Sequence, residues 1–152
     1  MSGFLAPEEY ALVYALVPIP CVDLVVVYNN KFLLGMRLNE PEKGKWFLPG
    51  GRTLKNETLL ECAVRKAHGE LGIKASPEEF KLLTVLDYKS THGPFSNDSL
   101  HCVNTIYLLK LSAEPKLKMD SQHSKLVWFS KIDPSWHPYV KEALICAGFD
   151  TD

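Results

Sequence analysis

Residues 46–73 read WFLPGGRTLKNETLLECAVRKAHGELGI and combine a glycine pair with a strongly patterned helix. Thr58 and Glu61 have the spacing of a capping box, in which each side chain bonds the backbone N–H of the other residue. Gly72 suits the left-handed position that ends a helix. Between these signals runs an apolar stripe with helical spacing, Leu60, Val64, Ala67 and Leu71. The stretch therefore predicts unusual backbone angles at the glycine pair and a helix over Leu59–Leu71.

Strand-like and helical segments alternate along the rest of the chain, without a repeat or a linker. Asn29-Asn30 separates two apolar runs and predicts a hairpin. Pro7 and the two glutamates after it predict a short helix over 7–17, which Pro18 and Pro20 end. The other predicted elements are strands Cys21–Tyr28, Phe32–Arg37, Phe80–Tyr88, Cys102–Leu111 and Lys125–Phe129 and a helix Pro138–Ala147. This mixed α/β order predicts a single domain over 1–152.

Composition limits the class of protein. A chain of 152 residues with 46% hydrophobic content can bury one sizeable core. The formal net charge of −1 gives no long-range attraction to nucleic acid or to an anionic membrane, so neither is an expected partner. An anionic ligand must then be held by local charges.

The spacing of the cysteines and the character of the N-terminal segment indicate the cellular compartment. The cysteines form no CxxC pair, which predicts neither a zinc site nor a redox motif; they are Cys21, Cys62, Cys102 and Cys146. The apolar segment after Glu9 has no positive charge before it, unlike a secretory signal. No apolar run reaches the roughly eighteen residues of a membrane span. The sequence thus predicts a soluble, cytoplasmic protein.

A spaced set of residues inside 51–73 resembles a known signature. Counted from Gly51, the set is Glu57, Arg65, Glu70, Gly72 and Ile73. This is the spacing of the Nudix box, although the family pattern has glutamates where this chain has Lys66 and Gly69. The resemblance implies the Nudix fold, an α+β architecture with a central mixed β-sheet sandwiched between helices.

One Nudix subfamily that lacks those glutamates resembles this chain beyond the box. The matching stretches are FLLGMR at 32–37, WFLPGGR at 46–52, FSND at 95–98, DSQH at 120–123 and VWF at 127–129. The subfamily is that of the GDP-mannose mannosyl hydrolases, and the resemblance spans roughly Asp23 to Phe129. It implies cleavage at the sugar carbon rather than at phosphorus, with inversion and release of GDP and free hexose.

The physical chemistry of that reaction explains why fewer acids suffice. Most glycosidases need one carboxylic acid to protonate the leaving group and a second carboxylate to activate water. A diphosphate is already a good leaving group, so only the base is still needed. Histidine titrates near neutrality, and His123 stands in a polar segment that we expect to be a loop able to reach the site.

The subfamily resemblance implies a residue set for metal and diphosphate. Gly50, through its carbonyl, Glu70 and Gln122 are the implied ligands of Mg²⁺, with Mn²⁺ as the alternative ion. His123 is the implied general base. Mg²⁺ takes about six oxygens and usually keeps waters and phosphate oxygens among them, so substrate must complete the shell. The same resemblance implies that two arginines contact the diphosphate, Arg37 and Arg52, whose guanidinium groups offer paired donors.

Two further residues have implied roles near the substrate. Asp23 matches an acidic residue directed toward the sugar or an arginine, and its alternative role is a simple turn acceptor. Arg65 is expected to orient the box loop and Glu57 rather than touch substrate. Asn104 stands where subfamily members place an aromatic ring, and Tyr88 where a histidine occurs, so the preferred base and sugar stay open.

Three activities and the oligomeric state remain open. The favoured activity is hydrolysis of a GDP-sugar. The first alternative is an ordinary Nudix pyrophosphohydrolase, for which Glu57 and Glu61 are the nearby spare acids. The second is a silent module that binds a nucleotide or a protein. The subfamily commonly forms dimers, so helix 7–17 is a candidate homodimer contact; the alternative is that its apolar residues cover the domain core, namely Tyr10, Leu12 and Leu16.

Overall fold

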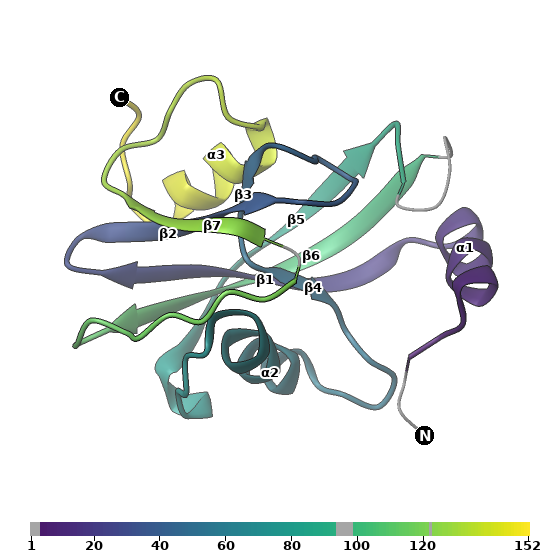
Figure 1. Cartoon of the computed structure of the whole chain (residues 1–152), viewed down its shortest axis with the longest axis horizontal. Helices are drawn as coiled ribbons and strands as arrows, with labels where there is room; N and C mark the ends of the chain where they lie inside the picture. The colour runs from purple at the N-terminus through teal and green to yellow at the C-terminus, as the bar shows by residue number, and fades with distance from the viewer. Residues whose placement is uncertain (1–3, 94–98, 122) are drawn as a thin grey trace.

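The computed structural model describes residues 4–93, 99–121 and 123–152. Its described elements run in the order α1 Pro7–Leu16, β1 Ile19–Tyr28, β2 Lys31–Arg37, β3 Trp46–Phe47, β4 Gly50–Arg52, α2 Leu59–Leu71, η1 Pro77–Glu79, β5 Phe80–Ser90, β6 Leu100–Leu111, β7 His123–Phe129 and α3 Pro138–Cys146. The strands form one mixed sheet in the order β3-β2-β1-β6-β5, with β4 paired to β1 and β7 paired to β2 (Figure 1).

Strand β1 is the centre of the sheet. It pairs in parallel with β6 along its whole length and antiparallel with β2 and β4. Helices α2 and α3 lie on opposite sides of it (Figure 1). A strand covered on both faces is expected to be apolar at successive positions, which explains the run from Leu24 to Val27 in place of alternation.

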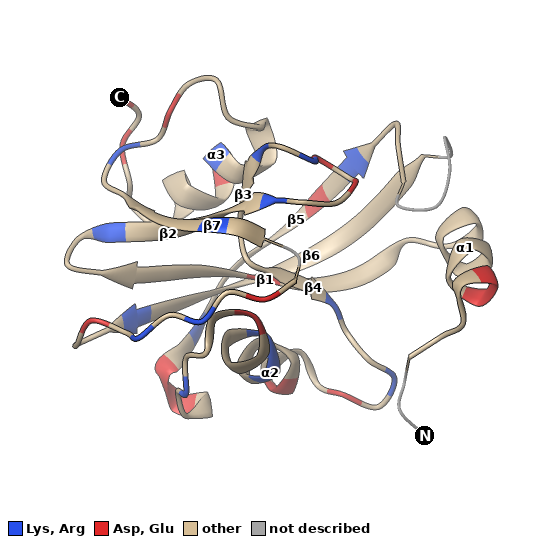
Figure 2. Ribbon diagram, in the orientation of Figure 1, with Lys and Arg blue, Asp and Glu red and all other residues tan. Residues whose placement is uncertain are grey.

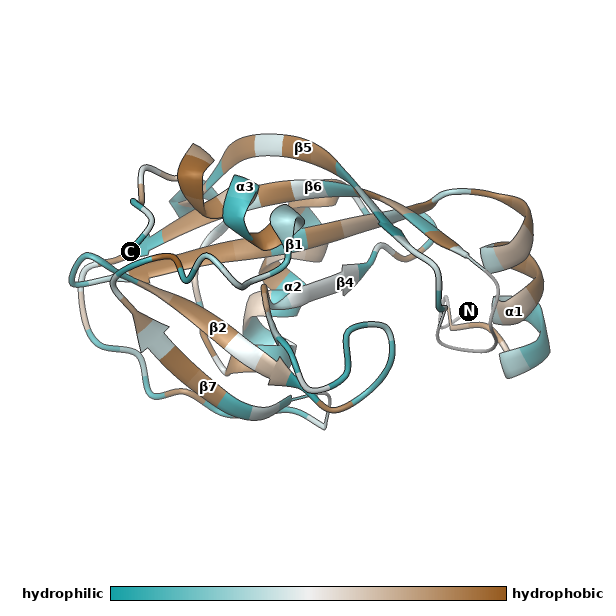
Figure 3. Ribbon diagram, turned by 90° about the horizontal axis from the view of Figure 1, so that it is seen from above, coloured by the Kyte–Doolittle hydropathy of each residue, from teal (hydrophilic) through white to brown (hydrophobic). Residues whose placement is uncertain are grey.

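Each face of β1 contributes to a separate core. Val22, Leu24 and Val26 pack with the buried face of α2. The alternate residues Cys21 and Val25 pack with the buried face of α3. Apolar colour follows β1 and β6 in Figure 3, and charged residues gather on α2, in loops and at strand ends in Figure 2. The predicted sheet between helices is confirmed.

The ends of α2 are formed as the sequence predicts. The backbone N–H of Glu61 donates to Thr58 Oγ1 at 3.1 Å, and the N–H of Thr58 donates to Glu61 Oε2 at 2.7 Å. Gly72 takes a φ of 70°, where a Cβ would also crowd Lys118. The helix spans Leu59–Leu71, which are the predicted limits.

Several predicted limits need correction. Helix α1 ends at Leu16 and α3 at Cys146, one residue before the predicted ends. Strand β7 begins at His123 rather than at Lys125, because residues from Arg37 back to Phe32 extend the pairing with it. Strands β3 and β4 were not predicted, since two or three residues are too few to show a period of two.

Helix α1 stands at one end of the sheet (Figures 1 and 3). Leu12 is 61% exposed and Leu16 is 71% exposed, so the interpretation that these residues cover the core is wrong. Tyr14 and Val13 do pack against the core. The homodimer contact at α1 stays a prediction. No helix among the described residues has the length and apolar character needed to cross a membrane.

The capping box of α2 makes a prediction for stability. Replacing Thr58 with Ala removes the acceptor for the Glu61 N–H and should lower the free energy of unfolding by about 1 kcal/mol. Urea denaturation measures the change. Ser112→Ala, at an exposed bend, is the control and should have no effect. Equal stability of Thr58→Ala and the wild type would contradict the role of the cap.

Candidate active site

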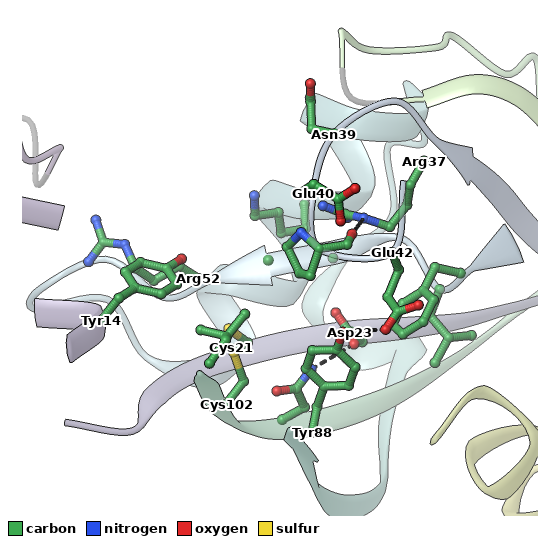
Figure 4. Close-up of a pocket in the computed structure, with 18 of the residues that line it drawn as sticks. Tyr14, Cys21, Asp23, Arg37, Asn39, Glu40, Glu42, Arg52, Tyr88 and Cys102 are labelled. Atoms are coloured by element: carbon green, nitrogen blue, oxygen red, sulfur yellow. Dashed lines mark hydrogen bonds between the residues drawn. The ribbon is translucent and has the colours of Figure 1, made fainter. Parts of the chain in front are cut away.

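A cavity of about 510 Å³ opens beside the start of β1 and the glycine pair of β4. Its lining includes four of the residues predicted to act on substrate or metal, Asp23, Arg37, Gly50 and Arg52. Figure 4 shows Asp23 and Arg37 on one side of this space and Arg52 on the other, beyond Cys21. Glu70 and His123 lie outside the lining, and Gln122 lies outside the described residues.

Glu70 connects α2 to the glycine pair. Its carboxylate is 4% exposed, and Oε2 accepts the backbone N–H of Gly50 at 2.9 Å. Oε1 lies 3.3 Å from Nζ of Lys66, one turn earlier on the helix. Burial raises the pKa of Glu70, and the positive charge of Lys66 opposes that rise. Each carboxylate oxygen keeps a lone pair for a further partner.

Gly50 is required by the close approach of β4 to β1. It pairs with Asp23 and has a φ of 154°, which a residue with a side chain rarely adopts. A Cβ at this position would collide with the Asp23 carboxylate and the Val22 carbonyl. The unusual backbone predicted for the glycine pair is therefore present at Gly50, and it brings the main chain next to a buried acid.

His123 is placed differently from the expectation. It is the first residue of β7 rather than part of a loop, and its side chain is 2% exposed. The ring packs against Gly35 of β2, where any Cβ would overlap it. The sequence could not reveal this burial, because it depends on a glycine on a different strand.

The two ring nitrogens of His123 have different surroundings. Nδ1 lies 2.9 Å from Oδ1 of Asp120. An ionised carboxylate only accepts, so the neutral tautomer that fits this contact has its proton on Nδ1 and a lone pair on Nε2. Nε2 is buried and has no hydrogen-bond partner among the described residues. An unpartnered buried nitrogen of this kind is suited to take a proton or to bind a cation.

Glu70, Asp120 and His123 form a compact cluster. One ligand atom from each lies within 4.8 Å of the others. Two carboxylates suit a hard divalent cation, and an imidazole nitrogen extends the suitable ions from Mg²⁺ to Mn²⁺ and its neighbours. Sequence reasoning missed Asp120, although it stands in the DSQH stretch three residues before His123. The described residues therefore fit the metal that the resemblance implies.

Arg65 holds the box loop, as predicted. Its Nε and Nη2 donate to the two carboxylate oxygens of Glu57 at 2.6 and 2.9 Å, and Nη2 also donates to the carbonyl of Arg52 at 3.2 Å. The hydrogen bond from Arg65 lowers the pKa of Glu57 to about 2. Glu57 also accepts the N–H of Leu54, so both of its oxygens are engaged.

The two predicted diphosphate ligands line the cavity from different elements. Arg37 ends β2, and its Nε donates to the Pro41 carbonyl at 2.7 Å. Arg52 ends β4, and its Nη2 donates to the Tyr10 hydroxyl at 2.9 Å. Its guanidinium carbon also lies 4.8 Å from the centre of the Tyr10 ring. Helix α1 thus positions one arginine.

Asp23 belongs to a buried network. Tyr139 of α3 donates its hydroxyl proton to Oδ2 at 2.5 Å, and Nδ2 of Asn104 donates to the same oxygen at 2.8 Å. Burial raises the pKa of Asp23 despite these bonds. The turn-acceptor alternative is wrong, since Asp23 lies inside β1.

Asn104 and Tyr88, two residues at which the sequence differs from the implied pattern, both have partners inside the domain. Asn104 supports Asp23 from the sheet and does not present a ring to a base. Tyr88 packs against Phe47 and donates to Glu42 at 2.9 Å. Tyr139 was missed by sequence reasoning, because only the fold brings α3 to β1.

Comparisons with known proteins agree with this architecture. The chain is 39% identical over 137 residues to the low-salt glycan biosynthesis protein Agl8 of Haloferax volcanii, covering 90% of this chain and 86% of that relative. It is 35% identical over 92 residues to an ADP-ribose pyrophosphatase of Methanocaldococcus jannaschii, covering 60% of this chain and 50% of that protein.

Solved structures give the same fold. A MutT NUDIX hydrolase from Burkholderia pseudomallei superposes with a TM-score of 0.71 at 27% identity, covering 85% of this chain and 97% of that chain. The α+β fold with a mixed sheet is therefore shared. The NUDIX domain pattern matches residues 18–143, most of the sequence. The chain belongs to the NUDIX domain family.

Proposed function

We propose that this protein is a divalent-metal-dependent hydrolase of a GDP-sugar such as GDP-mannose. Water attacks C1 of the sugar with inversion and releases GDP and free hexose. The observation that carries the proposal is the pairing of His123 with Asp120 beside Glu70. The relative from Haloferax volcanii, named for glycan biosynthesis, supports a nucleotide sugar as the substrate.

His123 is the general base in this proposal. Asp120 holds the imidazole by Nδ1, so the lone pair on Nε2 is available to take a proton from water. Ser121, two residues before His123, lines the cavity and brings this segment to the substrate side. The same pairing logic orients histidine bases in hydrolases of other folds.

The leaving group is held by two arginines that line the cavity from different sides. Arg37 and Arg52 bind the diphosphate, and their forked donors match its oxygens. Glu70, the Gly50 carbonyl and Gln122, with Asp120 nearby, would hold a divalent cation, which would supply further positive charge beside the diphosphate. Asp23, fixed by Tyr139 and Asn104, orients the sugar hydroxyls from inside the cavity.

Cleavage at phosphorus is the second candidate function. The ADP-ribose pyrophosphatase of Methanocaldococcus jannaschii favours it, although the chain aligns to only 50% of that protein. The spare acids of that alternative are already engaged, because Glu57 is bound by Arg65 and Glu61 caps α2. Sugar-carbon attack is the better supported reaction.

The products distinguish the two candidate functions. Incubation of GDP-mannose with Mg²⁺ should give GDP and mannose, since Glu57 and Glu61 are engaged by Arg65 and by the cap of α2. Anion-exchange chromatography separates GDP from GMP, and proton NMR of the first-formed mannose reports inversion. GMP and mannose 1-phosphate as the main products would reject attack at the sugar carbon.

The base makes a second prediction. His123→Gln should lower kcat by roughly 10²–10⁴-fold with little change in KM, because the ring touches water and not the nucleotide. Asp120→Asn should cause a smaller loss of kcat. The matched control is His101→Gln, which breaks a surface pair with Asp87 of the same 2.9 Å length and should leave kcat unchanged. Wild-type turnover in His123→Gln would mean that another group is the base.

The metal site makes a third prediction. Glu70→Gln keeps an oxygen for the Gly50 N–H but removes the charge, so Mn²⁺ affinity should fall at least about tenfold and most activity should be lost. Gln122→Ala should lower the Mn²⁺ affinity by a smaller factor. Electron paramagnetic resonance measures bound Mn²⁺, with Glu142→Gln on the exposed face of α3 as the control. Unchanged Mn²⁺ affinity in Glu70→Gln would place the ion elsewhere.

A further inference from the structure

Lys66 is a positively charged side chain that lines the cavity, and the proposed function gives it no role. It stands on the inner face of α2, and its side chain is 14% exposed. Its Nζ lies beside Gly51, where an added Cβ would come within 2.7 Å of the nitrogen. The missing side chain at Gly51 therefore makes room for the ammonium group at the cavity.

The positive charges that line the cavity differ in how firmly they are held. Arg65 is bound by both oxygens of Glu57, which neutralises it. Lys66 instead contacts Glu70 through a single 3.3 Å pair. That carboxylate is also part of the cluster suited to a divalent cation. Lys66 and a divalent cation would therefore compete for the Glu70 carboxylate.

Two cations at one carboxylate repel each other, because they lie only a few ångströms apart in a partly buried site. The two carboxylates of the cluster, Glu70 and Asp120, cannot neutralise both an ammonium and a divalent ion. An anion with several charged oxygens, bound in the cavity next to both cations, reduces the repulsion between Lys66 and the divalent cation. A diphosphate has that chemistry, and Arg37 and Arg52 line the same cavity.

We propose that Lys66 is a ligand of the substrate's diphosphate, released from Glu70 when a divalent cation binds that carboxylate. The assignment rests on the proposed function for the diphosphate substrate, and not on which bond is cleaved. In the box pattern this position is a glutamate, so a fixed positive charge stands where other family members have a metal-binding acid. Lys66 thereby contributes charge to the leaving group without a further metal ion.

A consequence is reciprocal coupling between anion and metal. With Lys66 present, the diphosphate relieves the repulsion and raises the affinity for the cation, and the cation raises the affinity for the diphosphate by the same factor. Without Lys66, the cation alone binds Glu70 more readily, and the diphosphate loses one charged partner.

Calorimetric titration with inorganic pyrophosphate in excess Mg²⁺, which releases Lys66 from Glu70, tests the direct contact. Lys66→Met should raise the Kd for pyrophosphate about tenfold, the loss of one charge-assisted bond. Lys66→Arg, which keeps the charge, should stay within about threefold of the wild type. Lys74→Met, an exposed lysine just after α2, is the control for loss of net charge and should bind as the wild type does.

Titration with Mn²⁺ alone and then with Mn²⁺ plus pyrophosphate tests the coupling. Lys66→Met should bind Mn²⁺ alone more tightly than the wild type and show less gain from pyrophosphate. If Lys66→Met keeps wild-type pyrophosphate affinity and only lowers the temperature of unfolding, Lys66 is a helix ion pair and the proposal is wrong. Folding of each variant is checked by circular dichroism.

Neither titration involves hydrolysis, so the inference and the proposed function fail separately. Loss of pyrophosphate affinity in Lys66→Met together with release of GMP from GDP-mannose would keep the Lys66 contact and reject attack at the sugar carbon. Release of GDP and mannose together with unchanged pyrophosphate affinity in Lys66→Met would support attack at the sugar carbon and reject the Lys66 contact.

Discussion

The hydrogen bond from the Gly50 N–H to the Glu70 carboxylate is the contact on which the site depends. It joins α2 to β4, and β4 is joined in turn to the central strand β1 by its pairing with Asp23. A buried carboxylate needs such partners, because removing it from water without them is costly. The same residue therefore fixes the backbone of the box and presents a negative charge to a cation.

Charge in and beside the cavity is arranged in two groups around this contact. Glu70, Asp120 and His123 form the group suited to a cation and to water. Arg37, Arg52 and Lys66 form the group suited to an anion. The two groups meet at Glu70 and Lys66, so under the proposed function the binding of a diphosphate and of a metal would be coupled. Such an arrangement places most of the required charge before substrate arrives.

Local signals in the sequence predicted α2, its cap, its end and the Arg65–Glu57 pair, because each depends on residues close along the chain. Contacts between distant segments were not predictable in that way. Tyr139 and Asp23 are 116 residues apart, and only the packing of α3 on the sheet brings them together. The burial of His123 likewise follows from the pairing of β7 with β2, which no local pattern of residues 120–123 reveals.

The contact of His123 with Gly35 has a consequence for how this site can diverge. A larger residue at position 35 would push the imidazole out of its place, whereas loss of the imidazole would leave an internal void beside the glycine. Either change alone passes through a poorly packed intermediate, so their effects cannot be additive. The two positions should therefore be inherited as a pair, and a lineage that has lost one is expected to have replaced the other.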